Sequence, residues 1–261
     1  MELLKPRKSR MLNKLRNGQK VISFKINSGS PRLVEMAASA GFDCVWICQE
    51  HVPTGAEIME AQIMAGKAHD VDVLVRVAKG SYSDLIRPLE ADASGIMVPH
   101  VRSAAEARKI AETVRFQPVG MRALDGGNAD GMYCALPTAE YVRFVNENRF
   151  VVIQIEDPEA VPELDEICAV PGIDIIFYGP GDYAHALGVP GQLDNPEVIR
   201  VRKLVLEAAH RHGKYAATVA SMANLKMLYE LGFDYLNCSS DVGLLNAGFK
   251  NIRAAANECG L

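Results

Sequence analysis

The sequence predicts an α/β protein with a single (β/α)8 TIM barrel, and three observations support this prediction. Short runs rich in Val, Ile and Phe alternate with amphipathic segments of about three helical turns. Eight such units follow one another in 261 residues, which is the length that a barrel of this kind needs. No G-x-G-x-x-G turn follows a strand, so a doubly wound nucleotide-binding sheet is the second choice.

The predicted strands are spaced regularly along the chain. They cover residues 21–27, 42–50, 72–78, 95–101, 150–156, 173–179, 214–221 and 233–239. The helices between them are expected to begin near positions 30, 54, 81, 103, 158, 195 and 222, mostly with Ser, Thr or Asn at or near the cap, and the last helix covers 242–259. A short helix over 8–18 ends at a glycine and is expected to cover the bottom of the barrel.

One insertion interrupts the repeat between the fourth helix and the fifth strand. It covers 117–149 and combines a Gly-rich segment with a helix predicted over 137–148. Long insertions at such junctions are more often functional than structural, so this one is a candidate lid or oligomer contact. Nothing in the composition indicates a second domain, and residues 1–261 are expected to form one domain.

The composition argues against several classes of protein. Hydrophobic residues make up 49% of the chain and charged residues 23%, as in ordinary globular proteins. The net charge of −4 argues against non-specific binding of nucleic acid. No apolar run approaches about 18 residues, and the start of the chain lacks the features of a signal peptide. We therefore expect a cytoplasmic protein with neither a nucleic-acid nor a membrane partner.

The stretch 150–188 contains the first candidate site. Two apolar runs in it end in acidic residues, Glu156 and Asp182, and the segment 158–170 between them is predicted to be a helix. Strands joined in this way are parallel neighbours, so the two carboxylates should lie at the same end of the sheet. Such a pair either holds a hard divalent cation or raises the pKa of one of its members, and a pair of solvated loop acids is the alternative.

Other strand ends add polar residues to the same face. His51 follows the second strand, Arg76 ends an apolar run in the third, and His100 follows the fourth. A cation inside an apolar strand needs an anion or a ligand, although a salt bridge at the barrel end would also satisfy it. A histidine, an arginine and two acids at one end of a barrel are typical of an enzyme.

Motifs at these strand ends resemble the HpcH/HpaI aldolase and citrate lyase family of metal-dependent 2-oxo-acid aldolases. They keep the family's order from about residue 17 to 245. The motifs are E-H at 50–51, V-R at 75–76, V-P at 98–99, G-x-R at 120–122, Q-I-E at 154–156, G-P-x-D at 179–182, A-L-G-x-P-G at 186–191 and Asp241 after the eighth strand.

The resemblance implies a cofactor and a substrate. It implies that Glu156 and Asp182 bind a divalent metal, Mg²⁺, Mn²⁺ or Co²⁺. It also implies that Gln154 and the backbone at Gly181 and Asp182 hold a small 2-oxo acid. The implied reaction cleaves a carbon–carbon bond of a 4-hydroxy-2-oxo acid to give pyruvate, or a similar 2-oxo acid, and an aldehyde.

The resemblance also implies catalytic roles for three residues. Arg76 would stabilise the enolate, His51 would be the general base, and Glu90 would support His51, from across the barrel top or from a neighbouring subunit. This cleavage needs a base for the hydroxyl proton and a sink for the charge of the enolate. The family further implies a homo-oligomer, a trimer or a hexamer, with the last helix exchanged between neighbours. The apolar positions of 242–256 fit this exchange and an ordinary eighth barrel helix equally well.

Several positions depart from the family's pattern. Cys48 stands where an acid near the base is usual, Glu90 replaces an Asp, Gly181 replaces an Ala, and His100 replaces an apolar residue. Three other functions stay open on these residues: an acyl-CoA lyase of the citrate lyase β type, a phosphosugar isomerase-type barrel, and an altered barrel that only binds a 2-oxo acid.

Overall fold

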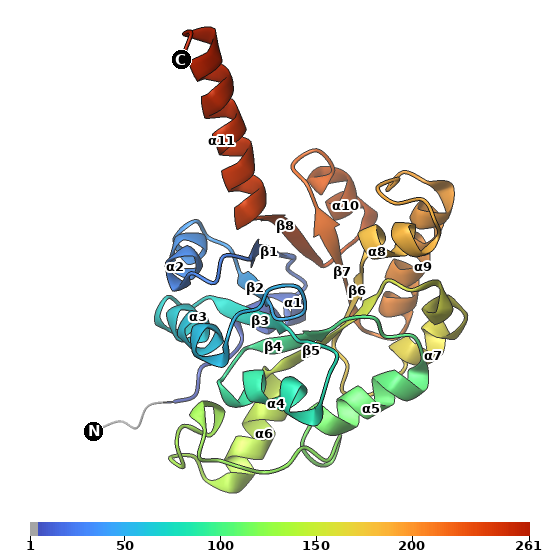
Figure 1. Cartoon of the computed structure of the whole chain (residues 1–261). Helices are drawn as coiled ribbons and strands as arrows, with labels where there is room; N and C mark the ends of the chain where they lie inside the picture. Colours follow the sequence, from blue (N-terminus) through green and yellow to red (C-terminus); the bar gives the residue numbers. More distant parts are fainter. Residues whose placement is uncertain (1–4) are drawn as a thin grey trace.

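The computed structural model describes residues 5–261, which form a closed barrel of eight parallel strands (Figure 1). Each strand pairs with the next along the chain, and the last pairs with the first. The predicted fold class and all eight predicted strands are therefore confirmed. The strands are β1 (Val21–Ile26), β2 (Cys44–Cys48), β3 (Asp72–Arg76), β4 (Gly95–Val98), β5 (Phe150–Ile155), β6 (Ile175–Tyr178), β7 (Tyr215–Ala220) and β8 (Tyr235–Ser240).

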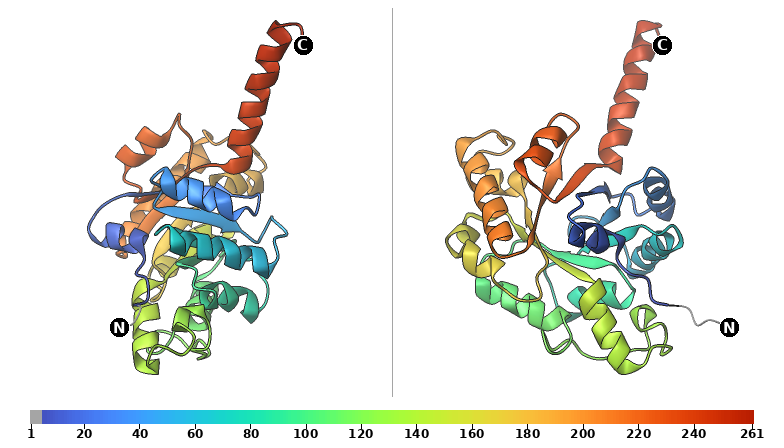
Figure 2. Two further views of the ribbon diagram at one scale, coloured as in Figure 1. Left: turned by 90° about the vertical axis from the view of Figure 1, so that its left-hand side faces the viewer. Right: turned by 180° about the vertical axis from the view of Figure 1, so that it is seen from behind.

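Most helices form a layer around the outside of the barrel (Figures 1 and 2). Two begin at predicted caps, where the side chains of Ser103 and Asn195 accept backbone N–H groups of the first turn, and Ser240 caps the last helix in the same way. The helices are α1 (Arg10–Arg16), α2 (Pro31–Ser39), α3 (Ala56–Ala68), α4 (Tyr82–Glu90), α5 (Ala104–Val114), α6 (Thr138–Asn148), α7 (Leu164–Cys168), α8 (Pro180–Ala186), α9 (Pro196–Arg211), α10 (Leu225–Leu231) and α11 (Asp241–Glu258).

Two segments differ from the prediction. The helix expected over 158–170 is a 3-10 helix, η2 (Pro158–Glu163), followed by the short α7. Pro162 lies inside this segment, and its ring has no N–H for an α-helical hydrogen bond. The second difference is a helix after β6 that the sequence analysis did not predict, α8, with Pro180 in its first turn. Asp182 therefore lies on a helix rather than in an open turn.

The interior of the barrel changes in character along its axis. Side chains alternate between inside and outside along each strand. Most inward residues of the lower layers are apolar and include Cys44, Leu74, Met97, Phe150, Val152 and Phe177. Towards the carboxyl ends the inward residues become polar, at Lys25, Cys48, Arg76 and Gln154. The apolar layers thus form a floor beneath a polar upper end.

Helix α1 closes the lower end of the barrel, as predicted. Its residues Met11, Leu12 and Leu15 are buried in the same cluster as the barrel interior. The buried carboxylate of Asp72 anchors the start of this helix. It accepts hydrogen bonds from the Ser9 hydroxyl at 2.5 Å and from the Met11 N–H at 2.8 Å. Within residues 5–261 the lower end of the barrel is therefore filled, so a ligand would enter from the upper end.

The last helix, α11, stands away from the barrel instead of packing along it (Figures 1 and 2). Only its first residue, Asp241, is buried, and the Asp241 carboxylate accepts the N–H groups of Asn27 and Ser28 at 2.9 Å. The rest of the helix exposes large apolar side chains. These are Val242, Leu244, Leu245, Phe249 and Ile252. None of the helices of residues 5–261 is long and apolar enough to cross a membrane.

The Asp72 anchor gives a prediction for stability. Arg7 bridges two carboxylates, at 2.5 Å from the buried Asp72 and 3.1 Å from the exposed Asp70. We expect Asp72→Asn to lower the free energy of unfolding by about 2 kcal/mol or more, because buried donors lose their charged acceptor. The matched control Asp70→Asn should change it by no more than about 0.5 kcal/mol. Urea unfolding followed by circular dichroism measures both, and equal losses would contradict the proposed anchor.

Candidate active site

Arg76 occupies the centre of the polar upper end. It is 4% exposed, and its guanidinium lies over the Trp46 ring at 4.8 Å. It donates to the sulfur of Cys48 at 3.1 and 3.3 Å and to Oε1 of Gln154 at 3.4 Å. The Glu50 carboxylate lies 2.9 Å from its Nε. The cation is paired, as expected, and its partner is an acid beyond the end of the neighbouring strand, so the barrel-end salt bridge given above as the alternative is present.

Glu156 lies beside this arginine, one residue beyond the end of β5. Its side chain is 1% exposed, and it accepts the N–H of His100 at 2.9 Å and the amide of Gln154 at 2.7 Å. Burial raises the pKa of Glu156 to about 7, the charge of Asp182 adds to this rise, and the contacts with His100 oppose it. The carboxylate is thus held in a dry position where a cation would stabilise its ionised form.

The residues present fit a divalent cation. Strands β5 and β6 are neighbours, so Glu156 and Asp182, in the first turn of α8, follow adjacent strand ends. Gly179 leaves the space that Glu156 occupies: an added Cβ would lie 2.9 Å from the Glu156 Cβ and closer still to its carboxylate. Within residues 5–261 no group of three or more His, Cys, Asp or Glu side chains could hold a metal. Two carboxylates suit Mg²⁺, which keeps several water ligands.

Glu50 joins the two histidines of the upper end. One of its oxygens lies 3.6 Å from Nε2 of His51, and the other lies 3.6 Å from Nε2 of His100. Nδ1 of His100 is 3.0 Å from the carboxylate of Asp157. Glu50 was not among the predicted site residues. It has the same strand parity as Cys48, and this inward parity was the signal that could have identified it.

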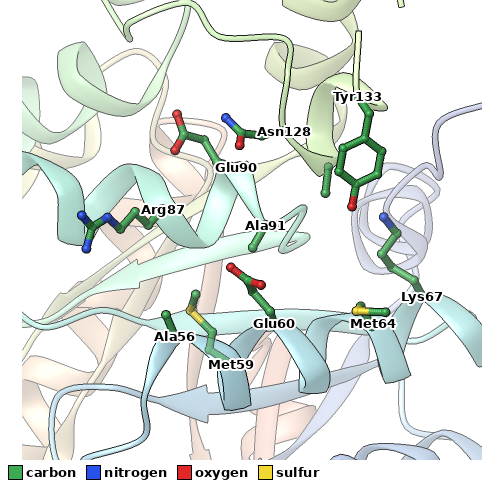
Figure 3. A pocket seen from close by; sticks show the side chains of 11 residues that line it. Ala56, Met59, Glu60, Met64, Lys67, Arg87, Glu90, Ala91, Asn128 and Tyr133 are labelled. Atoms are coloured by element: carbon green, nitrogen blue, oxygen red, sulfur yellow. The ribbon is translucent and has the colours of Figure 1, made fainter. Parts of the chain in front are cut away.

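Glu90 does not lie where the sequence reasoning expected it. Helix α4 follows β3 and runs back towards the bottom of the barrel, and Glu90 is its last residue, about 12 Å along the helix from its start. It lines a cavity of about 620 Å³ between α3, α4 and the insertion (Figure 3). Burial raises its pKa, and the charges that act on it include those of Arg122 and Asp130. The expectation that Glu90 reaches His51 across the barrel top is wrong.

The insertion folds around its own buried ion pair. Arg122 of the G-x-R motif contacts Asp130 at 2.8 Å, and the Tyr141 hydroxyl donates to the same carboxylate at 2.8 Å. The 3-10 helix η1 (Ala129–Gly131) packs against α4 and α6. The predicted helix over 137–148 is confirmed as α6. Together these contacts place this part of the insertion beside the outer helices, so they do not support its use as a lid.

A closed barrel with a buried arginine and two neighbouring carboxylates at its carboxyl end is typical of enzymes that act on small anionic molecules. The family described as HpcH/HpaI aldolase/citrate lyase matches residues 22–246. The chain therefore belongs to this family, which confirms the resemblance, and it is a carbon–carbon lyase of the aldolase type.

Several relatives support this assignment. The chain is 29% identical over 248 residues to a hydroxypyruvate/pyruvate aldolase of Pseudomonas aeruginosa, covering 94% of this chain and 91% of the relative. It is 30% identical over 207 residues to a 2-keto-3-deoxy-L-rhamnonate aldolase of Shigella sonnei, covering 79% and 77%. The crystal structure of an HpcH/HpaI aldolase from Desulfitobacterium hafniense matches with a TM-score of 0.90 and 29% identity, covering 95% and 96%.

The contact between Gly179 and Glu156 gives a second prediction. Gly179→Ala should displace the Glu156 carboxylate and lower the rate of 2-oxo-acid release by about 10²-fold, because small displacements of reacting groups have large effects. Gly55→Ala is the control, since a methyl group there meets no atom within 4 Å. Initial rates and thermal unfolding of both variants provide the measurement. A fully active, folded Gly179→Ala protein would show that Glu156 can move without consequence.

Proposed function

We propose that the chain cleaves a 4-hydroxy-2-oxo acid to pyruvate, or a similar short 2-oxo acid, and an aldehyde, with a divalent metal held by Glu156 and Asp182. The observation that carries this proposal is the position of the two carboxylates after adjacent strands. Gln154 links Arg76 to Glu156, because it accepts a hydrogen bond from the arginine and donates one to the carboxylate. When bound, Mg²⁺, Mn²⁺ or Co²⁺ supplies positive charge that stabilises an enolate oxygen. A cytoplasmic location is part of the same proposal.

Gln154 orients the 2-oxo acid in this proposal. Its amide oxygen accepts from Arg76 and its amide nitrogen donates to Glu156, so the side chain has one orientation between the two groups. The backbone N–H groups of Gly181 and Asp182 belong to the first turn of α8 and are available to the carboxylate of the substrate. Arg76 provides a fixed positive charge where the charge of the enolate develops.

His51 removes the proton of the substrate hydroxyl group. Its side chain is 59% exposed at the mouth, and the carboxylate of Glu50 lies 3.6 Å from its Nε2. Glu50 also faces Arg76, so it couples the position of the base to that of the arginine. Glu90 can support His51 only if it comes from a neighbouring subunit.

The metal gives the first test of this function. Pyruvate release from a panel of 4-hydroxy-2-oxo acids should require Mg²⁺, Mn²⁺ or Co²⁺ and stop after treatment with EDTA. Glu156→Gln and Asp182→Asn should abolish it without unfolding the protein, because each removes one of the two carboxylates. A coupled lactate dehydrogenase assay measures the pyruvate. Turnover that survives EDTA, or full activity of either variant, would exclude the metal site.

Arg76 gives the second test. Its charge acts more strongly on the enolate-like transition state than on the bound substrate, so Arg76→Ala should lower kcat by about 10² to 10³-fold. KM should change by no more than about threefold. Steady-state kinetics at saturating metal separate the two parameters. An effect on KM alone would make Arg76 a binding residue only.

We also propose a homo-oligomer, a trimer or a hexamer, in which α11 packs against a neighbouring copy of the chain. Helix α11 leaves its own barrel bare where an eighth outer helix would lie, and Ile22 on the outer face of β1 is 37% exposed. The large apolar side chains of α11 are exposed, and no other element of residues 5–261 covers them. A second copy has both the bare face and the helix that would cover it.

The oligomer proposal is tested on adjacent residues of α11. Phe249 is 64% exposed, and Phe249→Glu should dissociate the assembly because it places a charge in an apolar contact. Lys250→Glu, on the next position of the helix, should leave the assembly intact. Size-exclusion chromatography with light scattering gives the mass of each variant. An unchanged mass for Phe249→Glu would argue against the exchange of α11.

A further inference from the structure

Lys25 is a second cation inside the upper end of the barrel. It lies on β1 with inward parity, level with Trp46 on β2 and Ser240 on β8. Its Nζ is 4.8 Å from the centre of the Trp46 ring, the same ring that Arg76 covers at 4.8 Å. Two cations therefore share one indole, and their separation is at most twice that distance.

Lys25 differs from the other cations near the mouth in forming no salt bridge with any of residues 5–261. Arg76 is paired with Glu50 at 2.9 Å, Arg102 with Asp157 at 3.0 Å, and Lys79 with Glu106 at 2.6 Å. For the half-buried amine of Lys25, the part of the chain that the structure describes offers no hydrogen bond or ion pair, only the Trp46 ring. Burial and the nearby charge of Arg76 lower the pKa of Lys25, whereas the charges of Cys48, Glu50 and Asp182 oppose this change. A cation in this environment is stabilised by an anion that it meets there.

The position of β1 in the barrel indicates which part of a substrate Lys25 would meet. In the closed order of strands, β1 lies opposite β5, which carries Gln154 and leads to Glu156. A 2-oxo acid that is held beside Glu156 and is long enough to cross the mouth would bring its other end to β1. The four-carbon stem of a lysine is flexible and can carry the amine to a group at that end.

We propose that Lys25 binds an anionic group on the aldehyde portion of the substrate, so that the chain prefers substrates with a second carboxylate or a phosphate at that end. This inference rests on the proposed aldolase function. Lys25 is then a specificity-determining residue: it contributes to kcat/KM only for aldehydes that carry a negative charge. Neutral aldehydes of the same length have no group for it to bind.

The experiment compares two aldehydes with four carbons each in the condensation with pyruvate and Mn²⁺. Succinic semialdehyde carries a terminal carboxylate, and butanal does not. Lys25→Met should lower kcat/KM for succinic semialdehyde by about 10²-fold and for butanal by no more than about threefold. Lys25→Arg should restore at least a tenth of the activity with succinic semialdehyde. Lys25→Gln serves as a second neutral variant if Lys25→Met does not fold.

Lys20 provides the matched control. Lys20 lies just before β1, and its Nζ is also 4.8 Å from an aromatic ring, that of Tyr229. Unlike Lys25, it donates hydrogen bonds to the carbonyl groups of Tyr229 and Phe233. Lys20→Met should leave the ratio between the two aldehydes unchanged. A parallel loss with both aldehydes in Lys25→Met would show that Lys25 acts on the 2-oxo acid and overturn the inference. No loss with either would overturn it as well.

A binding measurement separates this inference from the proposed function. Succinate, which cannot react, should bind to the wild-type protein at least about tenfold more tightly than to Lys25→Met, as measured by titration calorimetry. If the wild type condenses neither aldehyde but retains this difference, the aldolase proposal fails while the anion site stands. If it condenses both aldehydes and the difference is absent, the aldolase proposal stands and the role of Lys25 is refuted.

Discussion

The burial of the Arg76 charge is the constraint on which the upper end of the barrel depends. A guanidinium with 4% exposure needs partners: Cys48 and Gln154 accept its N–H groups, and Glu50 supplies the opposite charge. These contacts orient the amide of Gln154, which in turn holds the Glu156 carboxylate at 2.7 Å. The geometry of the candidate metal ligand is therefore determined by a cation two strands away.

The same chain of contacts continues past Glu156. Its carboxylate accepts the N–H of His100, whose ring contacts Asp157, which pairs with Arg102 on the surface. His100 has a φ of 53°, a left-handed conformation that a histidine adopts infrequently. This conformation turns its N–H towards Glu156. Hydrogen-bond donors and acceptors are therefore linked from the buried Glu156 to Arg102 at the surface.

Periodicity was sufficient to predict the barrel and the side of each strand that faces inward. It also predicted that Glu156 and Asp182 follow adjacent strands, because consecutive parallel strands in a barrel are neighbours. The prediction for Glu90 failed because the position of a residue in a sequence motif does not give its height along the barrel axis. Height follows from the length and direction of α4, which carry its last residue to the lower end.

Two residues of the site were missed for a different reason. Lys25 lies in the run S-F-K-I, and a cation inside an apolar strand is the same signal that identified Arg76. It was overlooked because the motifs of the family do not include it. Glu50 belongs to the E-H motif at 50–51, but the resemblance to the family assigns a role only to His51 in that motif. Both could have been found by following the inward positions around all eight strands.

Closure between β1 and β8 has a consequence for the synthesis of the protein. Ser23 donates to or accepts from the hydroxyl of Tyr235 at 2.7 Å, and the two residues are 212 positions apart. At roughly 5 to 20 residues per second, β1 leaves the ribosome roughly ten to forty seconds before its partner does. For that interval the nascent chain carries an open strand edge, the feature that pairs most readily with other chains. The protein is therefore most exposed to aggregation while it is being made.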